Sequence, residues 1–163
     1  MKTRLEEFLK NKGIDDVIGY LNYVMNEADR ALQTYKTKFW LGVGLLALML
    51  MILPVVMNYL DKELGMYLTY AISGTILILD GMYIYYVMDR KNQLSILLSL
   101  TSRYMRKLQM LENNPLLSEN DKRRELNNNM KSYVRNLCRL FGVSRNALIR
   151  SLEQRNIRQI MLG

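Results

Sequence analysis

Residues 39–60 read FWLGVGLLALMLMILPVVMNYL, 22 residues without a charged side chain. As a helix they cover roughly 33 Å, and the hydrocarbon core of a bilayer is about 30 Å thick. A second window, residues 66–88, reads MYLTYAISGTILILDGMYIYYVM and contains a single charge, that of Asp80. A chain of 163 residues can hardly enclose two apolar helices of this length on all sides. The sequence therefore predicts two membrane-spanning helices.

The flanks of the two windows predict their topology. Aromatic residues that suit the membrane–water boundary lie near the window ends: Trp40, Tyr59, Tyr67, Tyr70, Tyr83, Tyr85 and Tyr86. The connector, residues 61–65, is so short that it forces an antiparallel hairpin and leaves no room for a pore helix with a filter. The positive-inside rule predicts that both termini are cytoplasmic, in an inner (cytoplasmic) membrane of bacterial type. The basic residues on which this rests are Arg30, Lys36, Lys38, Arg90 and Lys91.

The sequence outside the windows has helical periodicity. Residues 1–38 predict an amphipathic helical segment with a break at Lys12-Gly13, and residues 89–163 predict a basic helical domain. In that domain a first helix continues from Asp89 to about Met110. Ser118 caps a second helix that ends near Phe141, and Ser144, after the breaker Gly142, caps a third that runs to the chain end. The apolar face of the second helix comprises Leu126, Met130, Tyr133, Val134, Leu137, Cys138 and Phe141.

We therefore expect an all-α integral membrane protein, a two-span transmembrane helical hairpin with an amphipathic N-terminal helix and a basic cytoplasmic helical tail. The residue types exclude most enzyme classes. There is no histidine and one cysteine, Cys138, so a zinc site, a Ser-His-Asp or Cys-His pair and an intramolecular disulfide are not expected. The sequence also lacks a glycine-rich phosphate loop outside the spans. We predict no catalytic, cofactor-binding or metal-ligating residue.

Asp80 lies near the middle of the second span, where a carboxylate costs about 2.5–3.5 kcal/mol and should face protein or water. Thr69, Ser73 and Asp80 share one helical face, with Tyr83 at its edge. Small residues lie beside this face. The predicted helix-contact surface or ion path comprises Asp80, Ser73, Thr69, Tyr83, Ala71, Gly74 and Gly81.

Three roles remain open for Asp80. It can be protonated and hydrogen-bonded to Tyr83, to a backbone carbonyl or to another subunit. It can belong to a proton or cation path. It can also pair with a basic residue of a foreign membrane subunit, because the first span contains no base.

The tail carries most of the positive charge. Residues 122–163 contain ten bases and two acids, in a chain whose formal net charge is +8. Four of these bases share one face of the second helix, opposite its apolar face, and two more lie on the following helix. They are the candidate contacts for an anionic partner, lipid headgroups or nucleic acid: Arg124, Lys131, Arg135, Arg139, Arg145 and Arg150. A plain solvated surface is the alternative.

Residues 136–150 read NLCRLFGVSRNALIR and resemble a helix-turn-helix motif, with Cys138 four residues before the turn glycine, Gly142, and Leu148 six residues after it. The resemblance implies that the second helix enters the DNA major groove. The contacts it implies are Arg145, Asn146, Ile149 and Arg150. An ordinary helical corner produces much of the same pattern, and the preceding helix is longer than is usual in such motifs. We favour the corner.

The sequence thus favours a non-catalytic inner-membrane subunit or scaffold of a multiprotein or homo-oligomeric assembly, which docks partners or anionic lipid through its basic tail. Two alternatives remain. One is an oligomeric channel or pore-forming effector that uses Asp80. Its architecture is similar to that of mechanosensitive two-span channels, although the connector is far shorter than theirs. The other is a membrane-tethered DNA-binding protein.

Overall fold

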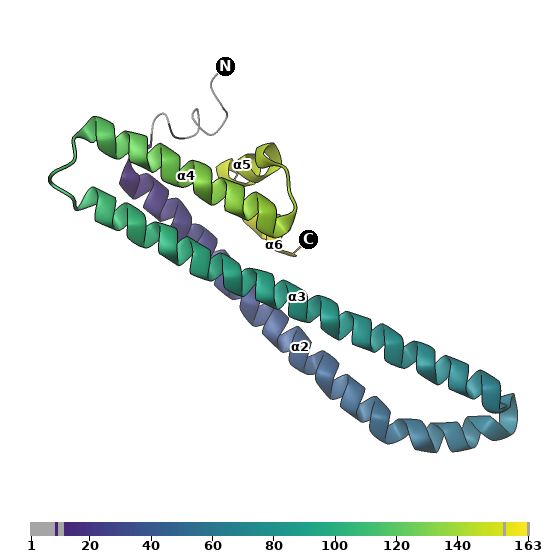
Figure 1. Cartoon of the computed structure of the whole chain (residues 1–163). Helices are drawn as coiled ribbons and strands as arrows, with labels where there is room; N and C mark the ends of the chain where they lie inside the picture. The colour runs from purple at the N-terminus through teal and green to yellow at the C-terminus, as the bar shows by residue number, and fades with distance from the viewer. Residues whose placement is uncertain (1–8, 10–11, 155, 163) are drawn as a thin grey trace. The chain divides into compact units, whose positions relative to one another are not determined.

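The computed structural model describes residues 9, 12–154 and 156–162, without the side chains of residues 60–64, 66, 159 and 162, and is shown in Figure 1. Within this range all regular secondary structure is helical, so the expected all-α class is confirmed. The beginning of the helix expected before Lys12 lies outside the described residues. The helices are α2 (Ile14–Leu64), α3 (Met66–Glu112), α4 (Glu119–Phe141), α5 (Arg145–Glu153) and α6 (Ile157–Leu162).

The chain forms two compact units. The first, here called the body, comprises Met1–Leu32 and Gln93–Gly163, and the second, here called the hairpin, comprises Gln33–Asn92. Helices α2 and α3, with 51 and 47 residues, each contribute one segment to the body and one to the hairpin.

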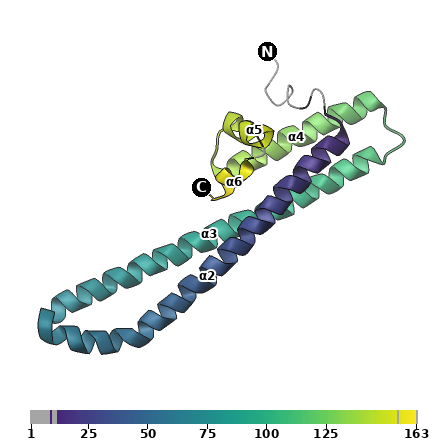
Figure 2. The same cartoon turned by 180° about the vertical axis from the view of Figure 1, so that it is seen from behind.

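The body segments of α2 and α3 bury residues at alternating steps of three and four. The series on α2 is Val17, Leu21, Val24, Ala28 and Ala31, and the series on α3 is Leu94, Leu97, Thr101, Tyr104, Leu108 and Leu111. This spacing of 3.5 residues on average is the heptad pattern of helices packed along their length. Helix α4 lies beside both segments (Figure 2) and buries Leu126, Met130, Tyr133, Val134 and Leu137 between them. Cys138 and Phe141, expected on the same face, are only half-buried.

A polar network joins α3 to α4 inside this core. The hydroxyls of Thr101 and Tyr133, both fully buried, lie 3.0 Å apart and share a hydrogen bond. The Tyr104 hydroxyl donates to Ser132 Oγ at 2.7 Å and accepts from Asn136 Nδ2 at 3.2 Å. Burial raises the pKa of Tyr133 far above its ordinary value of 10.0. Its hydroxyl therefore stays protonated, and its hydrogen bond fixes the register between α3 and α4.

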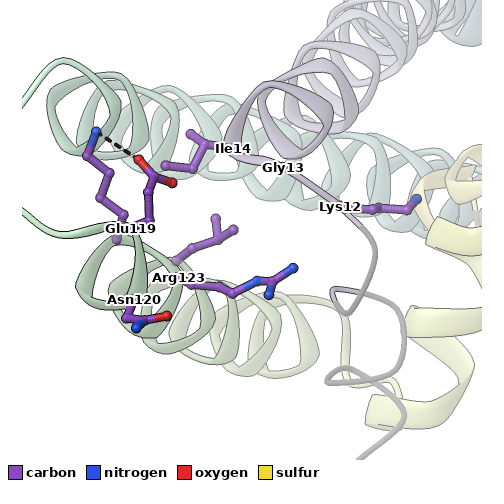
Figure 3. Close-up of a pocket in the computed structure, with 8 residues that line it drawn as sticks. Lys12, Gly13, Ile14, Glu119, Asn120 and Arg123 are labelled. Atoms are coloured by element: carbon purple, nitrogen blue, oxygen red, sulfur yellow. Dashed lines mark ion pairs between the residues drawn. The ribbon is translucent and has the colours of Figure 1, made fainter.

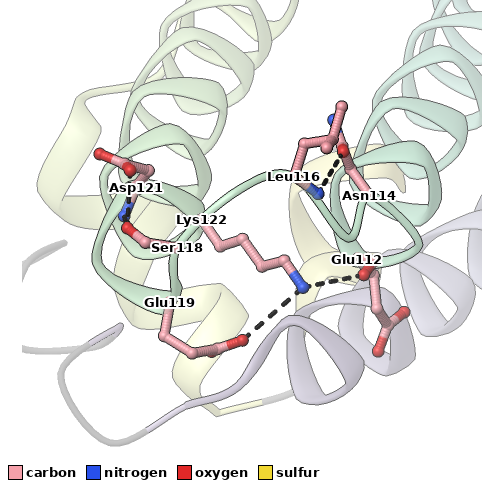
Figure 4. Close-up of polar contacts among 7 residues, drawn as sticks. All are labelled: Glu112, Asn114, Leu116, Ser118, Glu119, Asp121 and Lys122. Carbon is pink, nitrogen blue, oxygen red and sulfur yellow. Dashed lines mark hydrogen bonds and ion pairs between the residues drawn. The ribbon is translucent and has the colours of Figure 1, made fainter.

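The loop between α3 and α4 is held by side chains, as Figure 4 shows. Lys122 Nζ donates to the Glu112 carbonyl oxygen at 3.1 Å and pairs with Glu119 Oε1 at 3.6 Å. Ser118 caps α4 as expected, because its Oγ accepts from the backbone N–H of Asp121 at 3.2 Å. Lys122 therefore stabilises the carbonyl end of α3, which has no helical partner of its own.

The end of the chain differs from the expected single helix. Gly142 ends α4 in the left-handed conformation with φ 65°, and Ser144 caps α5, both as expected. However, α5 ends at Glu153, and a separate helix, α6, begins at Ile157. Gln154 donates to the Arg150 carbonyl and Asn156 to the Ser151 carbonyl, both at 2.9 Å. These bonds turn the chain so that Leu148, Ile149, Leu152, Ile157 and Met161 are all buried, which one straight helix does not achieve.

In the hairpin, α2 and α3 are separated by one non-helical residue, Gly65, with φ 81°. The connector expected at residues 61–65 is thus helical up to Leu64. Gly42 marks the closest approach of the two helices, because a Cβ placed there would lie 3.1 Å from the Tyr83 ring and 3.2 Å from Ile84 Cγ1. Pro54 lies inside α2 and deprives the Leu50 carbonyl of its helical donor. The hairpin segment of α2 bends before it reaches Gly65 (Figure 1).

We predict opposite effects of two glycine substitutions in the body. Gly142→Ala forces a Cβ into the left-handed region and should lower the free energy of unfolding by about 1 kcal/mol. Gly19→Ala, in an exposed helical position where a Cβ meets no described atom within 4 Å, should raise it by up to about 1 kcal/mol. Hydrogen exchange of the full chain in detergent measures both. Equal effects of the two substitutions would contradict the assigned end of α4.

Candidate functional site

The first candidate site is the surface of the hairpin, which is apolar and exposed. Helices α2 and α3 are both long and apolar enough to cross a membrane, and in their most apolar windows the protein buries only 6% and 11% of the residues. The core helix of a soluble protein is mostly buried, so these windows do not resemble one. Among the large apolar side chains, Trp40 is 69% exposed, Met51 78% and Ile78 64%. An exposed apolar surface of this kind needs a partner other than water.

The predicted polar face of the second window lies largely against α2. Thr69 and Ser73 are buried at 1% and 7% exposure, and Asp80 is half-buried. Thr69 Oγ1 donates to the Gly65 carbonyl oxygen at 3.2 Å, which satisfies its hydroxyl within the helix. Asp80 Oδ2 is buried and has no hydrogen-bond partner among the described residues. Asp80 thus holds an oxygen away from solvent without a partner among the described residues.

The remaining predicted contact residues of this window lie elsewhere. Tyr83 packs near Gly42, and no hydrogen bond joins it to Asp80 in the described part of the chain. Gly74 and Gly81 are open, because a Cβ at either would meet no described atom within 4 Å, and Ala71 is exposed. The structure therefore brings Thr69, Ser73 and Asp80 together on the inner face and leaves the small residues on the outside.

The second candidate site is the basic face of the body. Arg124, Arg135 and Arg139 of α4 are exposed and Lys131 is half-buried, on the side opposite the buried residues of this helix. Arg145 and Arg150 of α5 are exposed as well. Five of the six predicted bases are thus exposed to solvent, where an anion has access to them.

The corner between α4 and α5 is only partly compatible with the resemblance to a helix-turn-helix motif. Ile149, which that resemblance places against DNA, is 1% exposed and belongs to the core. Its assignment as a DNA contact is wrong, because α5 turns this side of the helix toward the core of the body. Arg145, Asn146 and Arg150 remain accessible.

Cys138 lies on α4 before this corner and is free. Burial raises the pKa of its thiol, and the nearby charge of Arg145 opposes the shift. The thiol is thus mostly protonated at neutral pH and is a poor nucleophile.

A pocket of about 260 Å³ opens between the beginnings of α2 and α4 (Figure 3). Lys12, Lys122 and Arg123 line it together with the carboxylate of Glu119. Two of these bases have other partners: Lys12 Nζ lies 3.8 Å from the centre of the Tyr20 ring, and Lys122 holds the loop described above. The lining thus combines three bases with one carboxylate.

Sequence reasoning missed the contacts among aromatic and basic residues where the apolar windows begin and end. Tyr86, Lys38, Arg90 and Lys91 enter the prediction only as boundary anchors and topology signals. In the hairpin, Lys91 Nζ lies 4.8 Å from the centre of the Phe39 ring, so the residues of the two helices are in contact. The signal that could have revealed this is the equal distance of Phe39 and Lys91 from the turn at Gly65.

No group of three or more His, Cys, Asp or Glu side chains that could hold a metal ion occurs in the described parts of the chain. Comparison of the sequence with protein-family models and curated proteins, and of the fold with solved structures, finds no match.

We predict that Asp80→Leu stabilises the hairpin. The substitution removes an unpaired buried oxygen, which costs about 1–3 kcal/mol, and leaves an apolar side chain in its place. Thermal unfolding of the full chain in mixed detergent micelles, followed by circular dichroism, measures the change. Asp89→Leu makes the same chemical change at an exposed carboxylate and should not stabilise. A loss of stability in Asp80→Leu would mean that Asp80 has a partner beyond this chain.

Proposed function

We propose that the protein is a non-catalytic subunit or scaffold of a membrane assembly, anchored by the hairpin and docking an anionic surface through the basic face of α4 and α5. The observation that carries the proposal is the nearly complete exposure of the apolar windows of α2 and α3. Lipid or a neighbouring membrane helix is the partner that suits such a surface.

Topology follows from charge. The two helices join at Gly65 within the hairpin, so the other ends of both windows lie on one side of the membrane. Lys36, Lys38, Arg90 and Lys91 lie at those ends. The positive-inside rule then places the body in the cytoplasm and the Gly65 turn on the other side of an inner membrane.

The body supplies the docking surface in this proposal. Arg124, Arg135 and Arg139 of α4 are exposed on the side opposite its buried residues, so they contribute little to the fold and are available to a partner. A complementary anionic surface would gain association rate and orientation from them. The docked surface is either an acidic protein or the headgroups of the membrane itself.

A second function, an oligomeric channel, is favoured by one observation. The unpartnered Oδ2 of Asp80 is a coordination position for a cation or a proton donor from another copy of the chain. In this arrangement several hairpins would surround the path, and the open strip at Gly74 and Gly81 would allow their helices to approach closely.

Cysteine accessibility tests whether the hairpin spans a membrane. In a Cys138→Ser background, single cysteines at Met51, Ile78 and Met110 all occupy exposed apolar positions, with 78%, 64% and 73% exposure. In inside-out membrane vesicles a water-soluble maleimide should label Met110→Cys and leave the other two unlabelled, because only they lie in the windows. All three should react after denaturation. Labelling of Met51→Cys and Ile78→Cys at the rate of Met110→Cys would disprove the spans.

Native mass spectrometry of the full chain extracted in mild detergent tests the assembly. We expect a hetero-complex or a homo-oligomer. Charge reversal of Arg124, Arg135 and Arg139 to Glu should remove a partner that is docked on the basic face. Reversal of Arg103, Arg106 and Lys107, exposed bases of α3, is the matched control and should leave it bound. A monomer without partners would contradict the scaffold, and a closed homo-oligomer that survives both reversals would favour the channel.

A further inference from the structure

Six residues form a belt at the body-side ends of the apolar windows. Helix α2 contributes Tyr35, Lys38 and Phe39, and α3 contributes Tyr86, Arg90 and Lys91. All six lie within the hairpin unit. Each cation lies over an aromatic ring: Lys38 Nζ is 5.2 Å from the centre of the Tyr35 ring, Arg90 Cζ is 5.6 Å from that of Tyr86, and Lys91 Nζ is 4.8 Å from that of Phe39.

The ring contacts of Lys38 and Lys91 position these cations without cancelling their charge. A cation over an aromatic face is held by the quadrupole of the ring, which carries no net charge. A cation paired with a carboxylate is instead neutralised. The sequence contains no acid between Asp29 and Asp61, and Asp89 is the acid that adjoins the belt on α3. The belt therefore keeps an excess of positive charge at the ends of two apolar windows.

Two hydroxyl groups complete the belt. The Tyr35 and Tyr86 hydroxyls act on each other electrostatically across the two helices, and the charge of Arg90 acts on both. The charge of Lys38 also acts on the Tyr86 hydroxyl, so this hydroxyl lies within electrostatic reach of both cations. Burial raises the pKa of Tyr35, the Tyr86 side chain adds to the shift, and the charge of Arg90 opposes it. Tyr35 thus keeps its proton, while Tyr86 is 44% exposed and accessible from outside.

This set of donors suits a phosphate group. Phosphate oxygens accept charge-assisted hydrogen bonds from guanidinium and ammonium groups, and tyrosine hydroxyls add neutral donors. The position of the belt indicates which kind of molecule would carry this phosphate. On one side lie the exposed apolar surfaces of the windows, so an anion bound here is next to a surface that accepts acyl chains.

We propose that the belt is a binding site for the phosphate of an anionic phospholipid, with Lys38 and Arg90 as its charged donors and Tyr86 as a neutral donor. The inference rests on the proposed membrane anchoring. It adds a defined lipid site to the hairpin, separate from the basic face of the body.

The test counts lipids bound to the full chain by native mass spectrometry from neutral detergent micelles that contain either phosphatidylglycerol or phosphatidylcholine. The wild-type chain should retain phosphatidylglycerol about tenfold more strongly than phosphatidylcholine. The double variant Lys38→Gln/Arg90→Gln should lose most of this preference. The control Arg103→Gln/Arg106→Gln has the same change in net charge on exposed positions of α3 outside the belt and should keep it. Tyr86→Phe, which removes one hydroxyl and keeps the ring, should lower the preference severalfold.

Three results would overturn the site. The wild-type chain could retain both lipids equally, the control could lose as much as the belt variant, or millimolar inorganic phosphate could displace the bound lipid, which would indicate a site for free phosphate. Circular dichroism of each variant establishes that it is folded. Maleimide protection at Met51→Cys separates the two proposals. If protection fails, the membrane anchoring fails, whereas intact protection without lipid preference removes the belt site alone.

Discussion

The chain covers little of the apolar sides of α2 and α3 itself, with 6% and 11% of the residues buried in the two most apolar windows. In the proposed arrangement lipid covers the rest. Such an arrangement would also account for the continuity of the helices, since a break within a window would expose backbone groups to hydrocarbon. The one interruption, at Gly65, lies between the windows. The Thr69 hydroxyl donates to the Gly65 carbonyl just before α3, and the Thr75 hydroxyl donates to the Ala71 carbonyl within α3.

The body, in contrast, buries apolar side chains in a core that its own helices form. Heptad spacing on α2 and α3 gives two seams, and α4 covers them with five buried side chains. The fully buried Tyr133 and Thr101 satisfy each other's hydroxyls. A purely apolar seam would tolerate sliding by one helical turn, whereas a buried hydrogen bond is lost when the register changes.

The features that the sequence predicted well are local. Ser118, Gly142 and Ser144 act within one turn of the chain, and each caps or breaks a helix where expected. The second break, between α5 and α6, carries no glycine or proline, and it depends on the burial of Ile157 and Met161 against the body. Ile149 was misassigned for the same reason. The periodicity of α3 placed Thr69, Ser73 and Asp80 on one face, but the close approach at Gly42 decides that this face lies toward α2.

The net charge of +8 combines bases that differ in what holds them. Lys122 is used by the fold, since Glu119 and the end of α3 bind it. Lys38 and Lys91 are held by aromatic rings, which fix their position and leave their charge in place. Arg124, Arg135 and Arg139 project from α4. The last two groups would attract anions in different ways. In the proposed functions the ring-held cations would present a fixed geometry to one headgroup, whereas the bases of α4 would present a broad field to an extended surface.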